Sequence, residues 1–301
     1  MRKSGRACCI SPRSFQSVFP LHLSSALVLT SFLCSSQVFV ERVEAQLADV
    51  PNLRIRGAID AYYNQLAHAS LESLQALAKM SLANTTQQSG DDEKGILYSQ
   101  IFPIENARYF CVELAKVQSS AITQIVRRAE TLFNDSLGSY VASVLRRPFG
   151  KMIDFADAVD LLMRSTPANE IQLHAAYSKS SFKRLAKEYT IKEMRKSIEA
   201  PSKRVQKHFA DDKDTSSQSA ADAGEDVPLL VWRSCEDNAA KEVDRFARIS
   251  RYLLPDGSVT LELTPLELRN FFHAAAPPPP KRRLGCMSDL QYGFDVRPRC
   301  V

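Results

Sequence analysis

Apolar side chains recur every three or four residues along most of this chain, and that spacing is typical of one face of an α-helix. The pattern runs from residue 37 to about residue 275 and predicts an all-α protein. The stretch 52–80 places six apolar side chains on one stripe, with a weak turn at Ala69–Ser70: Ile55, Ile59, Tyr62, Leu66, Leu74 and Leu77. The following stretch, 81–95, is polar and aperiodic, so we expect a loop there.

Proline and glycine divide the rest of the pattern into separate helices. A pair of helices is predicted over 104–146, with a break near 118–120 where the apolar spacing fails. Pro148 is the expected first residue of the next helix, because a proline at that position loses no helical hydrogen bond. A long helix over 229–254 is expected to end in a turn at residues 255–257, which read Pro-Asp-Gly.

Hydroxyl residues mark three further helix starts. Thr166 is a predicted N-cap, followed by Pro167 at the first helical position. Thr190 and Thr264 each precede a glutamate by three residues. That spacing is the capping box, in which the hydroxyl and the carboxylate each accept a hydrogen bond from an otherwise unpaired backbone N–H.

The stretch 191–209 has a helical seam with one position missing. The seam side chains are Ile191, Met194, Ile198, Val205 and Phe209, and Pro201 stands in the vacant position. A proline inside a helix removes one hydrogen bond and clashes with the preceding turn, at a cost of about 3 kcal/mol. We therefore predict a kink or a helix break at Pro201, and we expect a Pro201→Leu change to stabilise the helix.

The same pattern suggests how the chain is organised. Two helical bundles are predicted over 37–147 and 148–275, with a disordered acidic loop at 211–226. Residues 276–301 form a proline-rich basic tail. Residues 1–36 begin with basic side chains and continue into an apolar run, as a secretory signal does. That run is diluted by polar residues, so we favour an atypical N-terminal segment that is not part of the fold.

Positive charge is concentrated in one part of the chain. Residues 179–208 hold ten Lys or Arg against three Asp or Glu, whereas the formal net charge of the whole chain is +5. The candidate acidic-partner or lipid surface consists of Lys183, Arg184, Lys187, Lys192, Arg195, Lys196, Lys203, Arg204 and Lys207. This surface is either a solvated helix face or a binding surface for an acidic protein or an anionic lipid. Nucleic acid is disfavoured because no aromatic stacking pattern accompanies the charge.

The sequence offers little evidence of catalysis. Glycine is scarce, with ten in the chain, and no phosphate-binding loop, nucleophile elbow or HExxH motif is present. The five histidines are isolated in sequence. Asp154, Asp157 and Asp160 share one helix face, as metal ligands or, more simply, as solvated carboxylates. We therefore predict neither an enzyme, a cofactor nor a small-molecule substrate.

Cysteine and tryptophan favour structural roles. The seven cysteines are odd in number and contain no C-x-x-C pair, which argues against a disulfide framework or a zinc site. Cys111 and Cys235 fall inside helical patterns and are expected in the core. Trp232 lies on the apolar stripe of its helix and is expected to anchor the core. The reduced cytosol fits this cysteine usage best.

Several runs, in their order along the chain, resemble a known family. They are RPFGKMIDF, SKSSFKRLAKEY, KEMRKSIE, KRVQKHF and YLLPDG followed by LELT, with a similar upstream segment VFVERVEAQL. Together they are similar to the C-terminal region of the exocyst subunit SEC-three, also called exocyst component one, over about residues 38–275. The family pattern has IEALYKRV where this chain has IEAPSKRV, so Pro201 and Ser202 depart from it.

The resemblance implies a fold, a function and a location. It implies an elongated, all-α stack of helical bundles that helps to hold secretory vesicles at the plasma membrane before fusion. Its partners would be the other exocyst subunits, and its location the cytoplasmic side of the plasma membrane at secretion sites. The family's lipid- and GTPase-binding module is not matched in residues 1–36, so we do not carry its lipid binding over. The alternative is a peripheral membrane or phosphoinositide-binding protein that uses the basic residues of 179–208.

Overall fold

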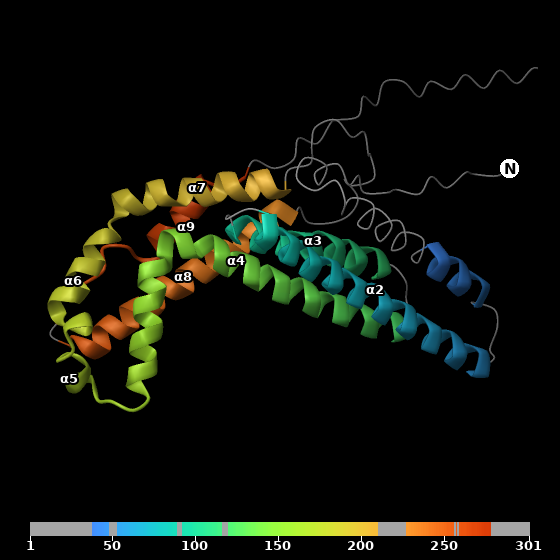
Figure 1. Cartoon of the computed structure of the whole chain (residues 1–301), viewed down its shortest axis with the longest axis horizontal. Helices are drawn as coiled ribbons and strands as arrows, with labels where there is room; N and C mark the ends of the chain where they lie inside the picture. Colours follow the sequence, from blue (N-terminus) through green and yellow to red (C-terminus); the bar gives the residue numbers. More distant parts are fainter. Residues whose placement is uncertain are drawn as a thin grey trace, which may run out of the picture.

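The computed structural model is an elongated assembly of helices (Figure 1), and it describes residues 38–47, 53–88, 92–115, 120–209, 227–255, 257 and 259–277. The predictions for 1–36 and 211–226, and nearly all of the predicted tail, lie outside these residues. Within the described ranges the chain is helical without a β-strand, which confirms the all-α prediction. The elements are α2 (Leu53–Gln88), α3 (Asp92–Leu114), α4 (Ser120–Met163), α5 (Ala168–Ile171), a 3₁₀ turn (Ala175–Tyr177), α6 (Lys179–Glu188), α7 (Ile191–Phe209), α8 (Val227–Leu253) and α9 (Pro265–Ala274).

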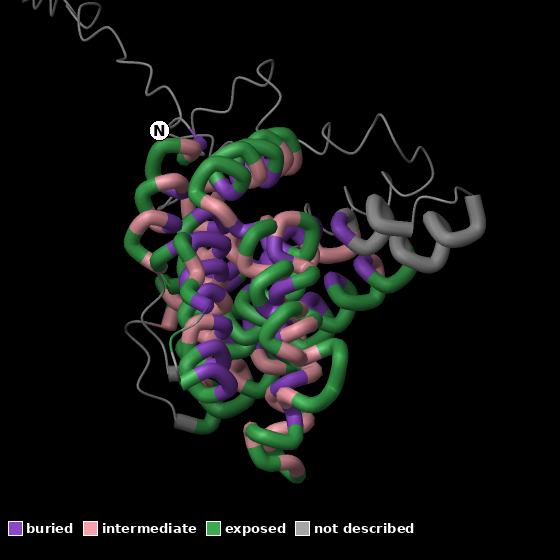
Figure 2. Tube along the Cα trace, turned by 90° about the vertical axis from the view of Figure 1, so that its left-hand side faces the viewer, coloured by how far each residue is buried: buried purple, intermediate pink, exposed green. Residues whose placement is uncertain are grey.

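The first group of helices consists of α2, α3 and the N-terminal part of α4. A short helix over 38–47 lies against the start of α2, where Arg56 binds Glu44 with 2.8 Å between Nη1 and Oε2. The gap between α3 and α4 falls at the break predicted near 118–120. Figure 2 shows the buried positions gathered between the helices and the exposed ones around the outside.

The prediction for α2 is wrong in three respects. The helix continues through Ala69–Ser70 without a turn, and the buried Ser70 hydroxyl donates to the carbonyl of Leu66 at 2.7 Å inside the helix. It also continues to Gln88, so residues 81–88 are helical and not a loop. Its core side chains belong to a neighbouring seam, and two members of the predicted stripe are exposed, Ile55 by 45% and Tyr62 by 68%. The residues that are buried instead are Tyr63, Ala67, Leu71 and Ala78, together with the predicted Leu74.

The helix predicted to begin at Pro148 is part of a longer one. α4 runs through Pro148 without interruption, and the predicted domain boundary at 147/148 falls inside it. Figure 1 shows α4 changing direction along its length, and an interior proline is a common cause of such a bend because its ring crowds the carbonyl four residues earlier. The Arg146 guanidinium reaches the Asp154 carboxylate, two turns later, at 2.6 Å.

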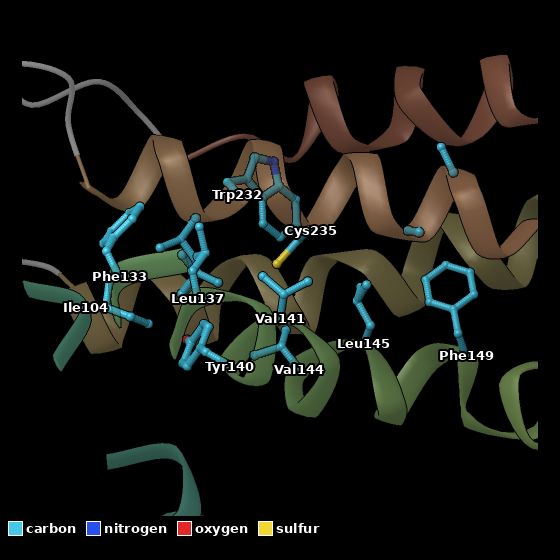
Figure 3. Close-up of a cluster of buried hydrophobic side chains, with 14 of the residues drawn as sticks. Ile104, Phe133, Leu137, Tyr140, Val141, Val144, Leu145, Phe149, Trp232 and Cys235 are labelled. Atoms are coloured by element: carbon cyan, nitrogen blue, oxygen red, sulfur yellow. The ribbon is translucent and has the colours of Figure 1, made fainter. Parts of the chain in front are cut away.

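The second group of helices packs around the C-terminal part of α4. Phe155 of α4 meets Phe182 of α6 and Phe246 of α8, with ring centroids 5.0 Å and 5.9 Å apart. Trp232 of α8 lies against Phe272 of α9 at 4.7 Å and donates from its indole nitrogen to the Phe272 carbonyl at 2.9 Å. Figure 3 shows that side chains of α4 and α8 form one apolar layer. The buried side chains of both helix groups belong to one continuous core.

The predicted start and stop signals had mixed outcomes. Thr264 and Glu267 form a complete capping box at the start of α9, as predicted. The Thr190 hydroxyl accepts from the Glu193 N–H at 3.4 Å. Gly257 has a positive φ of 65°, which suits the predicted turn after α8. Thr166 is not an N-cap. α5 starts at Ala168, so its N-cap position is Pro167, where no side-chain hydrogen bond forms.

Candidate functional site

The candidate surface begins on α6, which turns its cations away from the core. Phe182 is the buried side chain of this helix, and Lys183, Arg184 and Lys187 lie on the exposed side. Ser178 caps the helix by accepting a hydrogen bond from the Ser181 N–H at 3.4 Å. The orientation of α6 is therefore fixed by the burial of Phe182, with Leu185 and Ala186 packed beside it against the core.

The inner side of α7 is the seam predicted from the sequence. Met194, Ile198, Val205 and Phe209 are buried. Ile191 is the exception, since 39% of its surface is exposed at the first turn of the helix. Four of the five predicted seam residues therefore anchor α7 to the rest of the protein.

The outer side of α7 carries a row of lysines. Lys192, Lys196, Lys203 and Lys207 recur at steps of four, seven and four, which keeps them on one side of a helix. This row lies about half a turn away from the buried seam because successive residues rotate by about 100°. All four lysines are exposed, whereas Arg204 is half-buried.

We call the outward cations of α6 and α7 the basic face, and it consists of the nine predicted residues Lys183, Arg184, Lys187, Lys192, Arg195, Lys196, Lys203, Arg204 and Lys207. Carboxylates are fewer than cations in this part of the protein. Glu188 binds Lys151 of α4 at 2.6 Å, outside the basic face. Apart from Arg204, no member of the basic face forms an ion pair with a described residue. The positive charge is therefore open to a partner.

An open groove of about 700 Å³ lies at the start of α7, within the basic face. Three cations of α7 line it, and Glu199 and Glu262 add two carboxylates to its walls. Phe271 of α9 supplies an apolar wall. The complete lining is Thr190, Ile191, Lys192, Arg195, Lys196, Glu199, Glu262 and Phe271. The groove can accept an anionic group next to an apolar one.

The predicted helix break at Pro201 is wrong, because α7 is one helix from Ile191 to Phe209 with Pro201 inside it. Pro201 is buried and fills the vacant position of the seam itself. The adjacent Ser202, also buried, donates its hydroxyl hydrogen to the carbonyl of Ala275 at the end of α9. Packing and this hydrogen bond offset the proline's cost, so the helix continues. Whether the helix axis bends at Pro201 stays a prediction.

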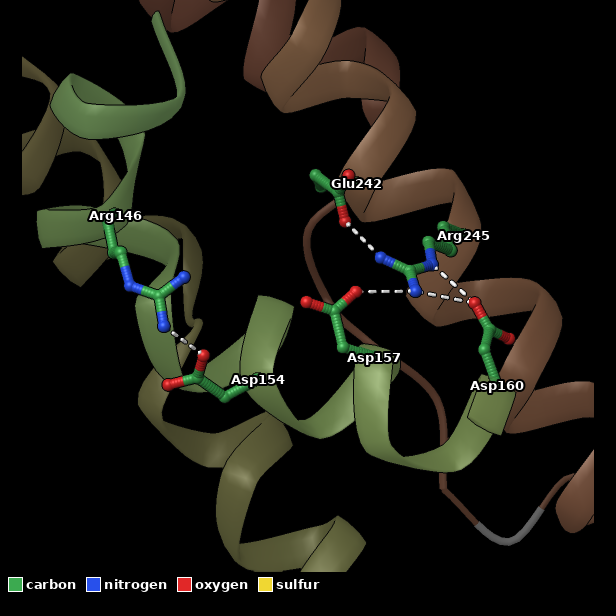
Figure 4. Close-up of polar contacts among 6 residues, drawn as sticks. All are labelled: Arg146, Asp154, Asp157, Asp160, Glu242 and Arg245. Atoms are coloured by element: carbon green, nitrogen blue, oxygen red, sulfur yellow. Dashed lines mark hydrogen bonds and ion pairs between the residues drawn. The ribbon is translucent and has the colours of Figure 1, made fainter. Parts of the chain in front are cut away.

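The three aspartates of α4 form ion pairs, as Figure 4 shows. Asp157 lies 2.7 Å from an Nη atom of Arg245 on α8, and Asp160 binds the same guanidinium. Asp154 binds Arg146 within α4 instead. No group of three potential metal ligands occurs among the described residues. Asp157 and Asp160 thus join α4 to α8, a role that neither of the two predicted alternatives included.

Burial changes the pKa of three further side chains, one histidine and two cysteines. Tyr140 of α4 and His208 of α7 share a hydrogen bond, with 2.9 Å between the hydroxyl oxygen and Nδ1. Burial, with Arg204 and Lys207 nearby, lowers the pKa of His208 to about 4. Burial raises the pKa of the thiols of Cys111 and Cys235 to about 12. Both cysteines are free core residues, as predicted.

The structure adds residues that the sequence did not reveal. Glu262 and Phe271 line the groove, Ser202 holds the end of α9, and Arg245 binds the aspartates of α4. Each of these residues lies next to residues that are distant in the sequence, so the local spacing of side chains does not predict its role. The IEAPSKRV run does single out Ser202 as a departure from the family pattern, although its hydrogen bond requires the folded chain.

Comparison with known proteins identifies the family. Residues 21–255 match the family model described as "Exocyst complex component Sec3, C-terminal". The chain belongs to this family. The match includes α2 to α8, and it also includes residues 21–36, which we had predicted to lie outside the fold.

Three curated relatives carry the name Exocyst complex component 1. The mouse protein is 22% identical over 221 residues, which cover 73% of this chain and 22% of the mouse protein. The Drosophila melanogaster protein is 26% identical over 58% of this chain and 18% of its own length. The Dictyostelium discoideum protein is 22% identical over 51% of this chain and 16% of its own length. The Sec3-family chain therefore spans about a fifth of these relatives.

No solved structure matches the chain. Among the described helices, none has the length and apolar content that crossing a bilayer requires.

Proposed function

We propose that this Sec3-family chain is a non-catalytic scaffold subunit of the exocyst, which helps to tether secretory vesicles at the plasma membrane before fusion. The observation that carries the proposal is the family match over residues 21–255, which includes helices α2 to α8. The subunit acts through helix faces that pack against other exocyst subunits. Its place is the cytoplasmic side of the plasma membrane, where the complex assembles.

The fold supports this assembly role. α4 packs against α2 and α3 at one end and against α8 at the other, so one helix connects the two groups. The core is continuous, with large aromatic rings interlocked between α4, α6 and α8. A rod of this kind presents long helix faces in a fixed arrangement, and this suits a subunit whose function is to contact several others.

Affinity isolation tests the proposal. A tagged chain, expressed in its own cells, should recover the other exocyst subunits, identified individually by mass spectrometry. A Phe246→Asp variant serves as a control, because a charge among the buried rings of Phe155 and Phe182 should unfold the second helix group and abolish the recovery. If the wild-type chain is folded by circular dichroism and recovers no exocyst subunit, the proposal is overturned.

A second candidate function, peripheral membrane binding, is favoured by the exposed lysines of the basic face. Each Lys or Arg close to an anionic leaflet contributes about 1 kcal/mol. Liposomes with and without phosphoinositide should therefore cosediment the wild-type chain to different extents. Reversing the charge at Lys192, Arg195, Lys203 and Arg204 should weaken binding at least tenfold.

The control for this experiment has the same change in net charge. It reverses four cations that lie outside the basic face: Lys79, Lys241, Arg248 and Arg251. Equal loss of binding in both variants would show that net charge, and not the basic face, drives adsorption. Unchanged binding after reversal of the basic face would remove the membrane hypothesis.

A further inference from the structure

Helix α2 carries a second apolar seam beside the one that it buries. The first half of this outer seam consists of Ile55, Ile59, Tyr62 and Leu66. These are the residues that the sequence pattern predicted for the core. Their spacing of four, three and four residues is the heptad spacing of a coiled coil, in which two helices pair along their lengths.

The second half of the outer seam continues in the same phase with Ala69, Ser73, Ala76 and Met80. All four are exposed, Met80 by 52%. The polar residues of α2, such as His68 and Glu72, occupy the remaining side of the helix. The outer seam is therefore a largely apolar strip that spans 26 positions along α2, exposed at six of its eight positions and half-buried at Ile59, which also packs against the main core, and at Leu66.

The short helix over 38–47 contacts a different side of α2. Its Glu44 binds Arg56, which is rotated by about 100° from Ile55 on the helix. Its buried residue, Val40, belongs to the main core. Ile55 and Tyr62 stay exposed beside this helix, so it does not cover these two positions of the outer seam.

The order of side-chain sizes along the seam indicates what covers it. Bulky side chains occupy the first half and small ones most of the second half. A second copy of α2 running antiparallel brings the two halves together. Leu66 of one copy then faces Ala69 of the other, and Tyr62 faces Ser73. The layers outside these pair Ile59 with Ala76 and Ile55 with Met80.

A parallel, in-register second copy fits poorly by comparison. It places Tyr62 against Tyr62, which crowds one layer, and Ala69 against Ala69, which leaves a gap in the next. Facing positions that alternate large and small side chains fill an interface evenly, without gaps or crowding. The size order thus favours the antiparallel arrangement.

Length and charge agree with a second copy. The seam is about 38 Å long at 1.5 Å per residue. Two helices paired over that length bury on the order of 1,000 Å² in total, which is where specific association begins. In the antiparallel register, Lys79 faces Ala58 and Glu72 faces Gln65, so no like charges oppose each other. We propose that the outer seam of α2 is the interface of an antiparallel homodimer.

The first test measures mass in solution. Analytical ultracentrifugation of the full chain should show a dimer whose fraction grows with concentration over the micromolar range. Ala69→Glu places a carboxylate at the centre of the interface and should weaken dimerisation at least tenfold. Ala61→Glu makes the same change at an exposed position of α2 outside the seam and should leave the dimer intact. A monomeric wild-type chain, or equal effects of the two variants, would overturn the proposal.

The second test reads the register directly. Protein carrying Tyr62→Cys, mixed with protein carrying Ser73→Cys, should form a disulfide between these two positions, mapped by mass spectrometry. Tyr62→Cys protein linking to itself at that position would indicate a parallel pair and contradict the proposal. A link to another exocyst subunit in place of a second copy would also contradict it.

The outcome is separable from that of the proposed function. Recovery of the other exocyst subunits by the Ala69→Glu chain shows that assembly into the complex does not depend on the dimer. Loss of their recovery by the wild-type chain would count against the proposed function alone.

Discussion

Single residues far apart in the sequence fix the contacts between helices. Arg245 is the centre of one such contact, because one guanidinium binds Asp157 and Asp160 of α4 and also Glu242 of its own helix. The aspartate spacing predicts a shared helix face, yet nothing in the spacing points to Arg245, 85 residues beyond Asp160. Residue roles were thus predictable where they depend on helical phase, and unpredictable where they depend on which helices meet.

His208 makes the stability of the fold depend on pH. Its pKa is lowered to about 4 because burial, and then the nearby Arg204 and Lys207, oppose its protonation. An unfolded chain binds that proton near pH 6.5, so stability is complete above this pH and is lost as the pH falls towards 4. The difference between the two pKa values corresponds to about 3 kcal/mol, and partial exposure of the ring reduces the expected loss to about 2 kcal/mol.

Urea unfolding at pH 7 and at pH 4.5 measures this loss of stability. Carboxylates titrate in the same pH range, so a His208→Gln variant is needed to separate the contribution of His208 from theirs. The variant should lose less free energy of unfolding between the two pH values than the wild-type chain. Identical losses in both proteins would show that His208 is not the group responsible.

Whole elements were predicted well where the apolar period is strong and poorly where proline seemed to end it. α8, α9 and the start of α7 agree with the sequence pattern. Pro148 and Pro201 were expected to start or break helices, and both lie inside one. An interior proline costs about 3 kcal/mol, and burial of the surrounding side chains outweighs that cost in both helices. The stripe on α2 failed for another reason, since two apolar seams lie side by side and periodicity alone does not rank them.

Replacement of Pro201 tests whether the free-energy cost of an interior proline exceeds the gain from its packing in α7. Leucine restores an N–H that can donate to the carbonyl of Ser197, four residues earlier, and removes a cost of about 3 kcal/mol. Its larger side chain must fit a buried position, at a cost of about 1–2 kcal/mol. We expect Pro201→Leu to raise the free energy of unfolding by about 1 kcal/mol, measured by urea denaturation.

Two matched variants sharpen that measurement. Pro201→Ala restores the N–H without the added volume and should stabilise the chain at least as much. Ala200→Leu changes an exposed neighbour on α7 and should have an effect within about 0.5 kcal/mol of zero. Destabilisation by Pro201→Ala would show that the proline ring itself holds the seam together.

The whole molecule is a rod in which one helix crosses from the first helix group to the second. α4 is 44 residues long and contributes buried side chains to both ends of a continuous core. The sequence predicted the all-α fold and the family. It did not predict this continuity, because the proline at position 148 suggested a boundary between two bundles.

Continuity of α4 predicts a single cooperative unfolding transition. Trp232 is the only tryptophan in the chain and hydrogen-bonds within the second helix group, so its fluorescence reports on the packing of α8 and α9 there. Circular dichroism reports on all helices. The two signals should give the same urea midpoint within error, because unfolding one end of α4 exposes core at the other. Separate midpoints would support the division into two bundles at 147/148.

The bend in α4 also determines how the rod responds to force. A pull along its length acts on a helix that is continuous through the bend, so the two ends cannot slide past each other without breaking backbone hydrogen bonds. The Arg146–Asp154 ion pair joins the turns on either side of Pro148. Because Pro148 cannot donate a backbone hydrogen bond, we expect the rod to yield under load at this point of α4 before it yields along either arm.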